Sequence, residues 1–170
     1  QPAEETGEGA AICCKLLEKK NIKEVYGLHN IPGFPLKSVL VRSGTFACAS
    51  TGLAITMTGT PSHAGYPEAG KNPGYALARL LLAVQELTAK IKKEKGFVLM
   101  TLIGMEVGSA NYGVSASNGT LRMTVRGEKE SVFNEYLAQI RSLAEKEASE
   151  EGLTLQIEEI ERFPATENHD

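Results

Sequence analysis

The stretch Leu53-Ala54-Ile55-Thr56-Met57-Thr58 alternates large apolar side chains with small or polar ones. Alternation with a period of two is typical of a β-strand that buries one face and exposes the other. The same alternation returns over residues 121–126 and 153–158, and an almost continuous apolar run covers residues 97–103. The sequence therefore predicts four strands in the part of the chain that follows residue 50.

Two amphipathic helices are predicted between these strands. Asn72 is a suitable helix cap, and Pro73 follows at the first helical position, where a missing N–H costs nothing. Apolar residues then recur at helical spacing over residues 77–91, and Gly96 ends the run. Residues 133–143 repeat this spacing and predict the second helix.

The elements follow one another as strand, helix, strand, strand, helix, strand. This order is that of the ferredoxin-like fold, in which two helices cover one face of a four-stranded, mostly antiparallel sheet. Right-handed connections leave few competing topologies. We therefore expect an α+β domain over residues 50–165. Its polar sheet face is available to a ligand, and an edge strand or outer helix is available to a second copy of the chain.

The part of the chain before residue 50 has a different pattern. Residues 7–20 favour an amphipathic helix, and residues 24–28 favour a short strand that leads to His29. Cys13 and Cys14 fall within the apolar helical pattern, so we expect them to be small core residues. The three cysteines of the chain have neither disulfide-framework nor zinc-knuckle spacing, which favours a reducing, cytoplasmic setting.

Composition excludes several classes of protein. Hydrophobic residues make up 42% of the 170 residues, which is enough for a packed core. Lys and Arg total 18 against 21 Asp and Glu, so the chain lacks the net basic charge expected of a nucleic-acid-binding protein. No apolar run approaches the roughly 20 residues needed to span a bilayer. The sequence therefore predicts neither a nucleic-acid nor a membrane partner.

Two segments near the start carry groups suited to a metal site. In the pair Glu4-Glu5, one carboxylate can bind a divalent cation while the other takes a proton from water. The alternative is two solvated charges at the start of a helix. His29 follows a short apolar segment, at the kind of strand end where α/β sheets bind ligands, and imidazole is a common metal ligand. The alternative is a loop histidine that makes local hydrogen bonds.

A third candidate, His63, lies in the polar segment Gly59-Thr60-Pro61-Ser62-His63-Ala64-Gly65. This segment follows a predicted strand, so burial in a core does not explain the histidine. Its ring can donate a hydrogen bond to a substrate carbonyl or carboxylate. The alternative is a solvent-exposed loop histidine without a role.

Five segments together carry a resemblance to a known family. They are Gln1-Pro2-Ala3-Glu4-Glu5, Gly27-Leu28-His29-Asn30, Ser62-His63-Ala64, Gly108-Ser109-Ala110-Asn111 and Gly119-Thr120-Leu121-Arg122-Met123-Thr124-Val125-Arg126. In order and with fitting intervals, they resemble the hippurate hydrolase and indole-acetyl-amino-acid hydrolase group, within the wider aminoacylase and carboxypeptidase metallopeptidases.

The resemblance implies a role for each matching residue. Glu4 is expected to be the general base, which deprotonates a water held between two divalent metals. Glu5 and His29 are expected to be metal ligands; such ligands are compatible with zinc, manganese or cobalt. His63 resembles the lid histidine that reaches the active site of the partner subunit and steadies the oxyanion. Asn111 matches a substrate-contacting asparagine of the lid, and no role is assigned to Arg126.

The resemblance also implies a domain division. Residues 1–49 are expected to be a fragment of an α/β, zinc-peptidase-like catalytic domain, residues 50–165 the lid and dimerisation domain, and residues 166–170 the start of the return to the catalytic domain. The upstream metal-binding segment and the final histidine of the family are absent from the chain. Tyr112-Gly113-Val114 stands where the family has Val-Ile-Pro. We therefore expect the chain alone to be inactive and the activity to belong to a longer parent protein.

The expected activity is metal-dependent hydrolysis of N-acyl or N-aroyl amino acids, or of short peptides, by a homodimer that associates through the lid. Two alternatives remain open. One is a dipeptidase or aminopeptidase of the wider family. The other is a non-catalytic module of the same fold that only dimerises or binds a small molecule.

Overall fold

A computed structural model of the protein describes residues 7–20 and 22–169. The chain divides into two compact units, residues 1–43 and residues 44–170. The second unit contains the sheet and the two helices that cover it. Among the described residues, no helix has both the length and the apolar character needed to cross a membrane.

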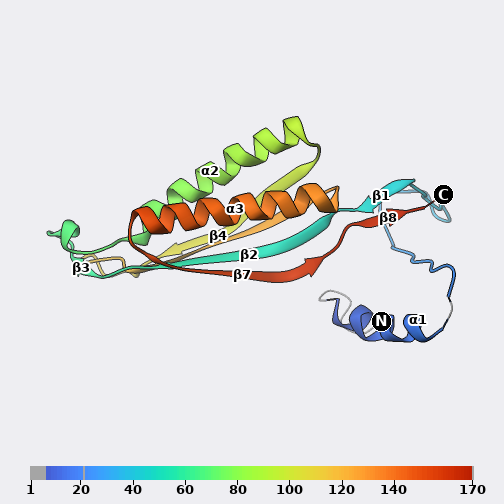
Figure 1. Ribbon diagram of the computed structural model, residues 1–170, viewed down its shortest axis with the longest axis horizontal. Helices are drawn as coiled ribbons and strands as arrows, with labels where there is room; N and C mark the ends of the chain where they lie inside the picture. The colour runs from blue at the N-terminus through green and yellow to red at the C-terminus, as the bar shows by residue number, and fades with distance from the viewer. Residues whose placement is uncertain (1–6, 21, 170) are drawn as a thin grey trace. The chain divides into compact units, whose positions relative to one another are not determined.

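The second unit is built on a four-stranded sheet. Its strands are β2 (Ala49–Thr58), β4 (Val98–Val107), β6 (Asn118–Gly127) and β7 (Thr154–Phe163). Their spatial order is β4-β6-β2-β7, and each neighbouring pair runs antiparallel. The helices α2 (Pro73–Glu94) and α3 (Glu130–Glu150) lie on one face of this sheet (Figure 1). The predicted α+β, ferredoxin-like fold is confirmed.

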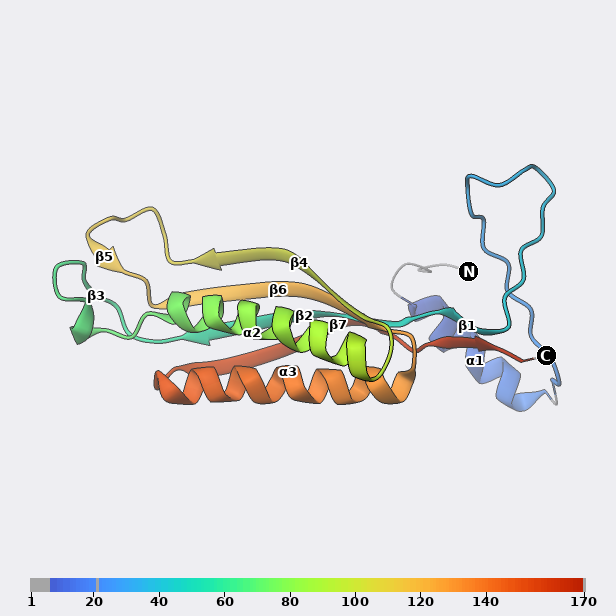
Figure 2. The same ribbon diagram turned by 90° about the horizontal axis from the view of Figure 1, so that it is seen from above.

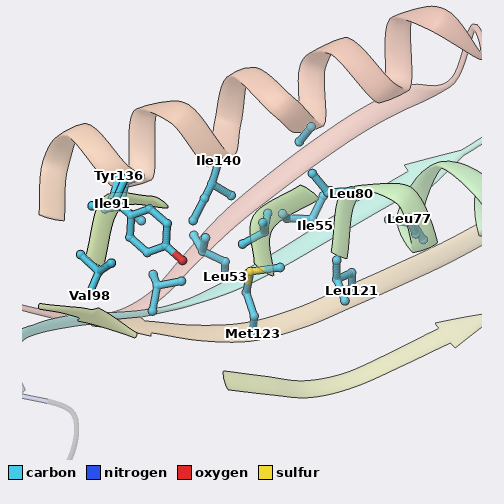
Figure 3. Packing of buried hydrophobic residues seen from close by; sticks show 14 of the residues in the cluster. Leu53, Ile55, Leu77, Leu80, Ile91, Val98, Leu121, Met123, Tyr136 and Ile140 are labelled. Carbon is cyan, nitrogen blue, oxygen red and sulfur yellow. The ribbon is translucent and has the colours of Figure 1, made fainter. Parts of the chain in front are cut away.

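The alternation that predicted the strands places the core between the sheet and the helices. In β2, Leu53, Ile55 and Met57 are at most 2% exposed, whereas the intervening residues are more accessible. Figure 3 shows apolar side chains of both helices pointing toward those of β2 and β6. Full burial of one such side chain contributes about 1.5–3 kcal/mol. This apolar layer therefore supplies most of the stabilisation of the unit.

The start of α2 is fixed as the sequence predicts. The side chain of Asn72 accepts a hydrogen bond from the Gly74 N–H at 2.8 Å, and Pro73 occupies the first turn. The amide nitrogen of Asn72 donates to the Ser115 hydroxyl at 3.2 Å. Asn72 therefore joins the helix start to the loop between β4 and β6.

A hydrogen bond between the half-buried Thr88 and the buried Tyr136 joins the two helices. Thr88 donates to the Val84 carbonyl at 2.6 Å, so its oxygen accepts the hydrogen bond from the Tyr136 hydroxyl at 2.5 Å. Burial raises the pKa of Tyr136, and the hydrogen bond to Thr88 opposes this shift. The pair satisfies the one polar atom of a completely buried aromatic side chain.

An ion pair network fastens the same helices at the other end of α2. The Arg79 guanidinium donates to Glu147 at 2.8 Å and to Glu151 at 2.6 Å. The hydrogen bond to Glu147 is the main cause of a raised pKa for Arg79. Because Glu147 is nearly buried, Arg79 is needed to balance its charge.

Two short strand pairs were not predicted, because two- to four-residue strands carry no periodic signal. The first is β1 (Gly44–Ala47) with β8 (Thr166–Asn168), and the second is β3 (Ser62–His63) with β5 (Val114–Ser115). The two pairs lie at opposite ends of the main sheet (Figures 1 and 2). A 3-10 turn, η1 (Pro67–Ala69), lies in the loop that follows β3.

The first unit contains the predicted helix, α1 (Glu8–Lys19), but two expectations for this unit were wrong. Residues 24–28 are not a strand, because no described residue of the unit pairs with their backbone, and a strand needs such a partner. Cys13 and Cys14 are exposed rather than in a core. Ile12 on the same helix is 69% exposed, so the apolar side chains of α1 are not covered by the described residues.

Candidate functional site

The expected catalytic base Glu4 and the expected metal ligand Glu5 lie outside the residues that the structure describes. The other expected ligand, His29, is exposed in the first unit. Its Nδ1 lies 3.0 Å from the Asn30 carbonyl oxygen. A carbonyl only accepts, so Nδ1 carries the proton and Nε2 keeps its lone pair. This is the form of neutral imidazole that binds a metal through Nε2.

His29 is not part of a complete metal centre within the described residues. Over residues 7–20 and 22–169, no three His, Cys, Asp or Glu side chains come together as a possible metal-binding group. A centre of three or more such ligands that includes His29 therefore needs at least one ligand from outside the described residues.

The expected lid histidine, His63, lies at the tip of the second unit, at the end of β3. The Tyr66 N–H donates to the His63 carbonyl at 2.9 Å and closes a tight turn over Ala64 and Gly65. The Gly65 N–H donates to His63 Nδ1 at 3.0 Å. The Tyr66 ring lies 5.9 Å from the imidazole, centroid to centroid. The imidazole is thus held against its own turn, although it is exposed.

The expected substrate residue Asn111 lies between β4 and β5, which begins at Val114. Figure 2 shows the loop that joins these strands. Its side-chain oxygen accepts from the Gly113 N–H at 3.0 Å, and its carbonyl accepts from Val114 at 3.3 Å. This loop is joined to the turn that follows His63, because the Ala64 N–H donates to the Gly113 carbonyl at 3.0 Å. Since His63 also pairs with Val114, the structure brings His63 and Asn111 together from separate parts of the sequence.

The tip of the second unit consists of the loop over residues 60–71 and the loop with β5 over residues 108–117. Backbone hydrogen bonds close it where it joins the main sheet. Thr60 and Lys71 exchange two of them, at 3.2 and 2.9 Å, and the Gly59 N–H donates to the Ser117 carbonyl at 2.8 Å. A Cβ atom on Gly59 would lie 2.1 Å from the Lys71 carbonyl oxygen, so only glycine allows this approach. The loop between residues 60 and 71 therefore leaves β2 at a fixed place.

A shallow hollow of about 250 Å³ lies beside β5. Residues 107–109 and 114–118 line it, and they include Ser109 of the predicted Gly-Ser-Ala-Asn segment. Its volume is below that of most small-molecule sites, so the hollow by itself is too small to enclose such a ligand.

The two arginines of the last motif lie on the sheet face that the helices leave uncovered, whereas Leu121, Met123 and Val125 of that motif are buried in the core. Arg126 is exposed there and pairs in register with Ser50 and Leu99. Arg122 forms an ion pair with Glu106 at 3.1 Å on the same face. Sequence reasoning missed two backbone groups of the tip, the N–H of Gly65 and that of Gly113. The only available signal was a glycine two residues after each polar side chain.

Comparison with known proteins identifies the fold and the relatives of this chain. Residues 48–152 match the family described as peptidase dimerisation domain. Hippurate hydrolase of Campylobacter jejuni is 28% identical over 128 residues, which are 74% of this chain and 33% of that protein. N-acetyl-L-cysteine deacetylase of Bacillus subtilis is 27% identical over 135 residues, which are 79% of this chain and 32% of that protein. N-acetyldiaminopimelate deacetylase of Leuconostoc mesenteroides is 28% identical over 149 residues, which are 85% of this chain and 38% of that protein.

Solved structures share the fold. An aminobenzoyl-glutamate utilization protein from Klebsiella pneumoniae matches with a TM-score of 0.64 and 22% identity, over 74% of this chain and 33% of that chain. A hydantoinase/carbamoylase family amidase from Burkholderia ambifaria matches with a TM-score of 0.65 and 22% identity, over 72% of this chain and 30% of that chain. The chain thus spans about a third of the length of these relatives. By its match over residues 48–152, the chain belongs to the peptidase dimerisation domain family.

Proposed function

We propose that the full-length protein hydrolyses the amide bond of N-acyl amino acids and that this chain supplies its lid. The observation that carries the proposal is the pairing of β3 with β5, which brings His63 and Asn111 to one tip. Both residues match the family motif, and both side chains have polar N–H groups. Amide hydrolysis needs such groups at the developing oxyanion and at the substrate carboxylate.

The names of the relatives support the proposed substrate class. Their names include a hippurate hydrolase, an N-acetyl-L-cysteine deacetylase and N-acetyldiaminopimelate deacetylases, each an enzyme that acts on an acylated amino acid. We place the reaction in the cytoplasm, where the three free cysteines remain reduced.

The domain division belongs to the proposal. Residues 1–49 are assigned to the catalytic domain, residues 50–165 to the lid, and residues 166–170 to the return toward the catalytic domain. A lid that brings its donors to the substrate couples catalysis to domain closure.

His29 has the form needed to hold a divalent ion, because its Nδ1 is bound to a carbonyl and Nε2 keeps its lone pair. Glu5, which lies outside the described residues, would be a second ligand. Zinc, manganese and cobalt all accept such ligands. When bound, such ions would lower the pKa of a bound water so that it loses a proton near neutral pH and becomes a nucleophile, and they would polarise the amide carbonyl.

Three residues of the chain then have separate roles in the reaction. Glu4 takes the proton of the attacking water and later delivers it to the leaving nitrogen. The His63 N–H binds the carbonyl oxygen as its negative charge develops. Asn111 binds and orients the substrate.

A hydrolysis screen of the full-length protein tests this function. N-acetyl amino acids, N-benzoyl amino acids and dipeptides are incubated with the enzyme and with zinc, manganese or cobalt, and the released amino acid is measured. We expect hydrolysis of acylated amino acids only with a divalent ion present, and none by Glu4→Gln. Full activity of that variant would exclude Glu4 as the base. Hydrolysis of dipeptides alone would favour a dipeptidase.

We further propose that the lid forms the homodimer through the edge strand β4. This strand has nine uncharged residues and only Glu106 as a charged one. Leu102 and Ile103 on it are 47% and 62% exposed, and Leu82 and Tyr75 of the adjacent α2 are 59% and 70% exposed. An apolar strand edge with an apolar helix beside it suits pairing with a second copy of the same edge.

The opposite edge of the sheet is unsuited to such pairing. The strand β7 contains the charged run Glu158, Glu159, Glu161 and Arg162, and the backbone of Glu161 is in the left-handed region at φ 52°. Charges and irregular backbone are devices that keep strand edges unpaired. The contrast between the two edges favours β4 as the interface.

Replacing Ile103 by lysine is expected to convert the dimer into a monomer. Ile103 is unpaired at a bulge of β4 and mostly exposed, so the substitution leaves the core intact but places a buried charge at the interface. Light scattering after size-exclusion chromatography measures the mass. The matched control is Gln156→Lys on the edge strand β7, which should stay dimeric. If the Ile103→Lys variant stays dimeric, or if the Gln156→Lys control becomes monomeric, β4 is not the dimer interface.

A further inference from the structure

The two polar side chains at the tip of the second unit share one arrangement. In each, an acceptor atom binds the backbone N–H two residues later: His63 Nδ1 binds that of Gly65, and the Asn111 side-chain oxygen binds that of Gly113, both at 3.0 Å. A backbone N–H is always a donor. Each bond therefore determines which atom of the side chain faces the turn.

For His63, this bond selects one tautomer. Nδ1 accepts, so in the neutral ring the proton is on Nε2. The ring comes this close because residue 65 has no side chain. A Cβ atom there would lie 3.2 Å from Nδ1 and 3.4 Å from Cε1, which is tighter than an ordinary contact.

For Asn111, the same kind of bond determines the orientation of the amide. The oxygen is occupied by Gly113, so the NH₂ group is directed away from the turn. The nitrogen atoms that the two turns leave free are consequently donors from both residues, Nε2–H of His63 and the NH₂ of Asn111.

We infer that the N–H groups of Gly65 and Gly113 are positioning groups that set the hydrogen-bond polarity of the tip. They leave His63 with a donor as its free ring nitrogen, and they direct the NH₂ donor of Asn111 away from the turn. The ligand that the tip recognises is then a pure acceptor, such as a carbonyl oxygen, an oxyanion or a carboxylate. The catalytic use of this polarity rests on the proposed function; the polarity itself rests on the hydrogen bonds alone.

Nuclear magnetic resonance of this chain tests the polarity without any catalysis. The ¹⁵N and ¹³C shifts of the three histidine rings are recorded at about pH 9, where imidazoles are neutral. The signal of His63 is assigned with His63→Gln. We expect Nε2–H for His63, and a dominant Nδ1–H form would overturn the inference, since that form cannot accept from Gly65.

A pair of glycine substitutions supplies a matched comparison. Gly65→Ala retains the N–H but forces the ring away, so the preference of His63 for Nε2–H should fall. Gly113→Ala places its Cβ atom 3.5 Å from the Asn111 oxygen, which is an ordinary contact, so the tautomer of His63 should not change. Equal effects of both substitutions would contradict the specific role of Gly65.

The substitution Asn111→Asp tests whether Asn111 is needed as a hydrogen-bond donor or only as an acceptor that supports its own turn. The aspartate still accepts from Gly113, so folding and melting temperature should be unchanged. Its second oxygen, however, is an acceptor in place of the NH₂ donor. In the full-length enzyme we expect KM for an acylated amino acid to rise at least about tenfold, because like charges face each other. An unchanged KM would overturn the inference.

The two proposals fail in different ways. If the full-length protein hydrolyses nothing while His63 is Nε2–H, the proposed function fails and the polarity stands. If the enzyme hydrolyses acylated amino acids while His63 is Nδ1–H, the inference fails alone.

Discussion

Replacing His63 by alanine in the full-length protein is expected to lower kcat about a hundredfold to a thousandfold, with a much smaller change in KM. Loss of one oxyanion donor typically has an effect of this size, since the bond is strongest in the transition state. His63 is exposed and at the tip, so its removal leaves the apolar core untouched. Steady-state kinetics with a saturating acylated amino acid measures the change.

The control for this prediction is Glu68→Gln in the same loop, which should retain wild-type kcat because Glu68 is exposed in η1 and lacks a role in the proposed mechanism. An equal loss in this variant would show that the loop, not the imidazole, is responsible. A kcat of His63→Ala close to that of the wild type would exclude the donor role.

A mixing experiment extends the test to the partner subunit. If His63 acts across the dimer, a subunit with His63→Ala and one with Glu4→Gln form a mixed dimer with one intact site. Equal amounts of the two inactive variants, reassembled together, should then regain about a quarter of the wild-type activity, because about half of the dimers are mixed. No recovery would show that His63 acts within its own subunit.

Replacing Phe133 by alanine is expected to destabilise the second unit by about 3–5 kcal/mol, the range for deletion of a fully buried aromatic side chain. Phe133 is completely buried in the first turns of α3, and the Arg162 guanidinium lies 5.6 Å from its ring centroid. Because small domains are stable by only about 5–15 kcal/mol, much of the folded state should be lost. Urea unfolding followed by circular dichroism measures the free energy of unfolding.

Phe97 offers a matched control for this loss. It too has a cation over its ring, since Lys92 Nζ lies 5.7 Å from the centroid, but it is 39% exposed. Phe97→Ala should therefore destabilise by about 1 kcal/mol or less. If both substitutions had the same effect, the cation and not burial would be the source of stability.

The main sheet and its helices could be predicted because each carries a repeated signal. The alternation of Leu53, Ile55 and Met57 reports one buried face, and Asn72 with Pro73 marks the start of α2. In a strand every second residue faces the core, and in a helix every third or fourth residue does, so each element repeats its apolar pattern several times in the sequence. Only the ends of the strands differ: β4 continues to Val107, beyond the predicted end.

The tip could be predicted only as a set of residues. His63 and Asn111 were identified by resemblance, but their proximity depends on a two-residue strand pair and on the backbone hydrogen bond from Ala64 to Gly113. Such contacts involve main-chain atoms that every residue has, so side-chain patterns do not reveal them. The short strand expected over residues 24–28 failed for a related reason, since the sequence pattern does not show whether a pairing partner is available.

The strand pair β1–β8 has a consequence for the modular use of this domain. Gly44 pairs with Asn168 and Thr45 with Glu167, so the polypeptide enters and leaves the domain side by side. A segment with adjacent ends can be cut out of one gene and placed into another without altering the spacing that the host must bridge. Chimaeras between relatives are therefore best joined within these two strands. In such a chimaera the lid would be exchanged as a cassette, and the rest of the host protein would keep its own sequence.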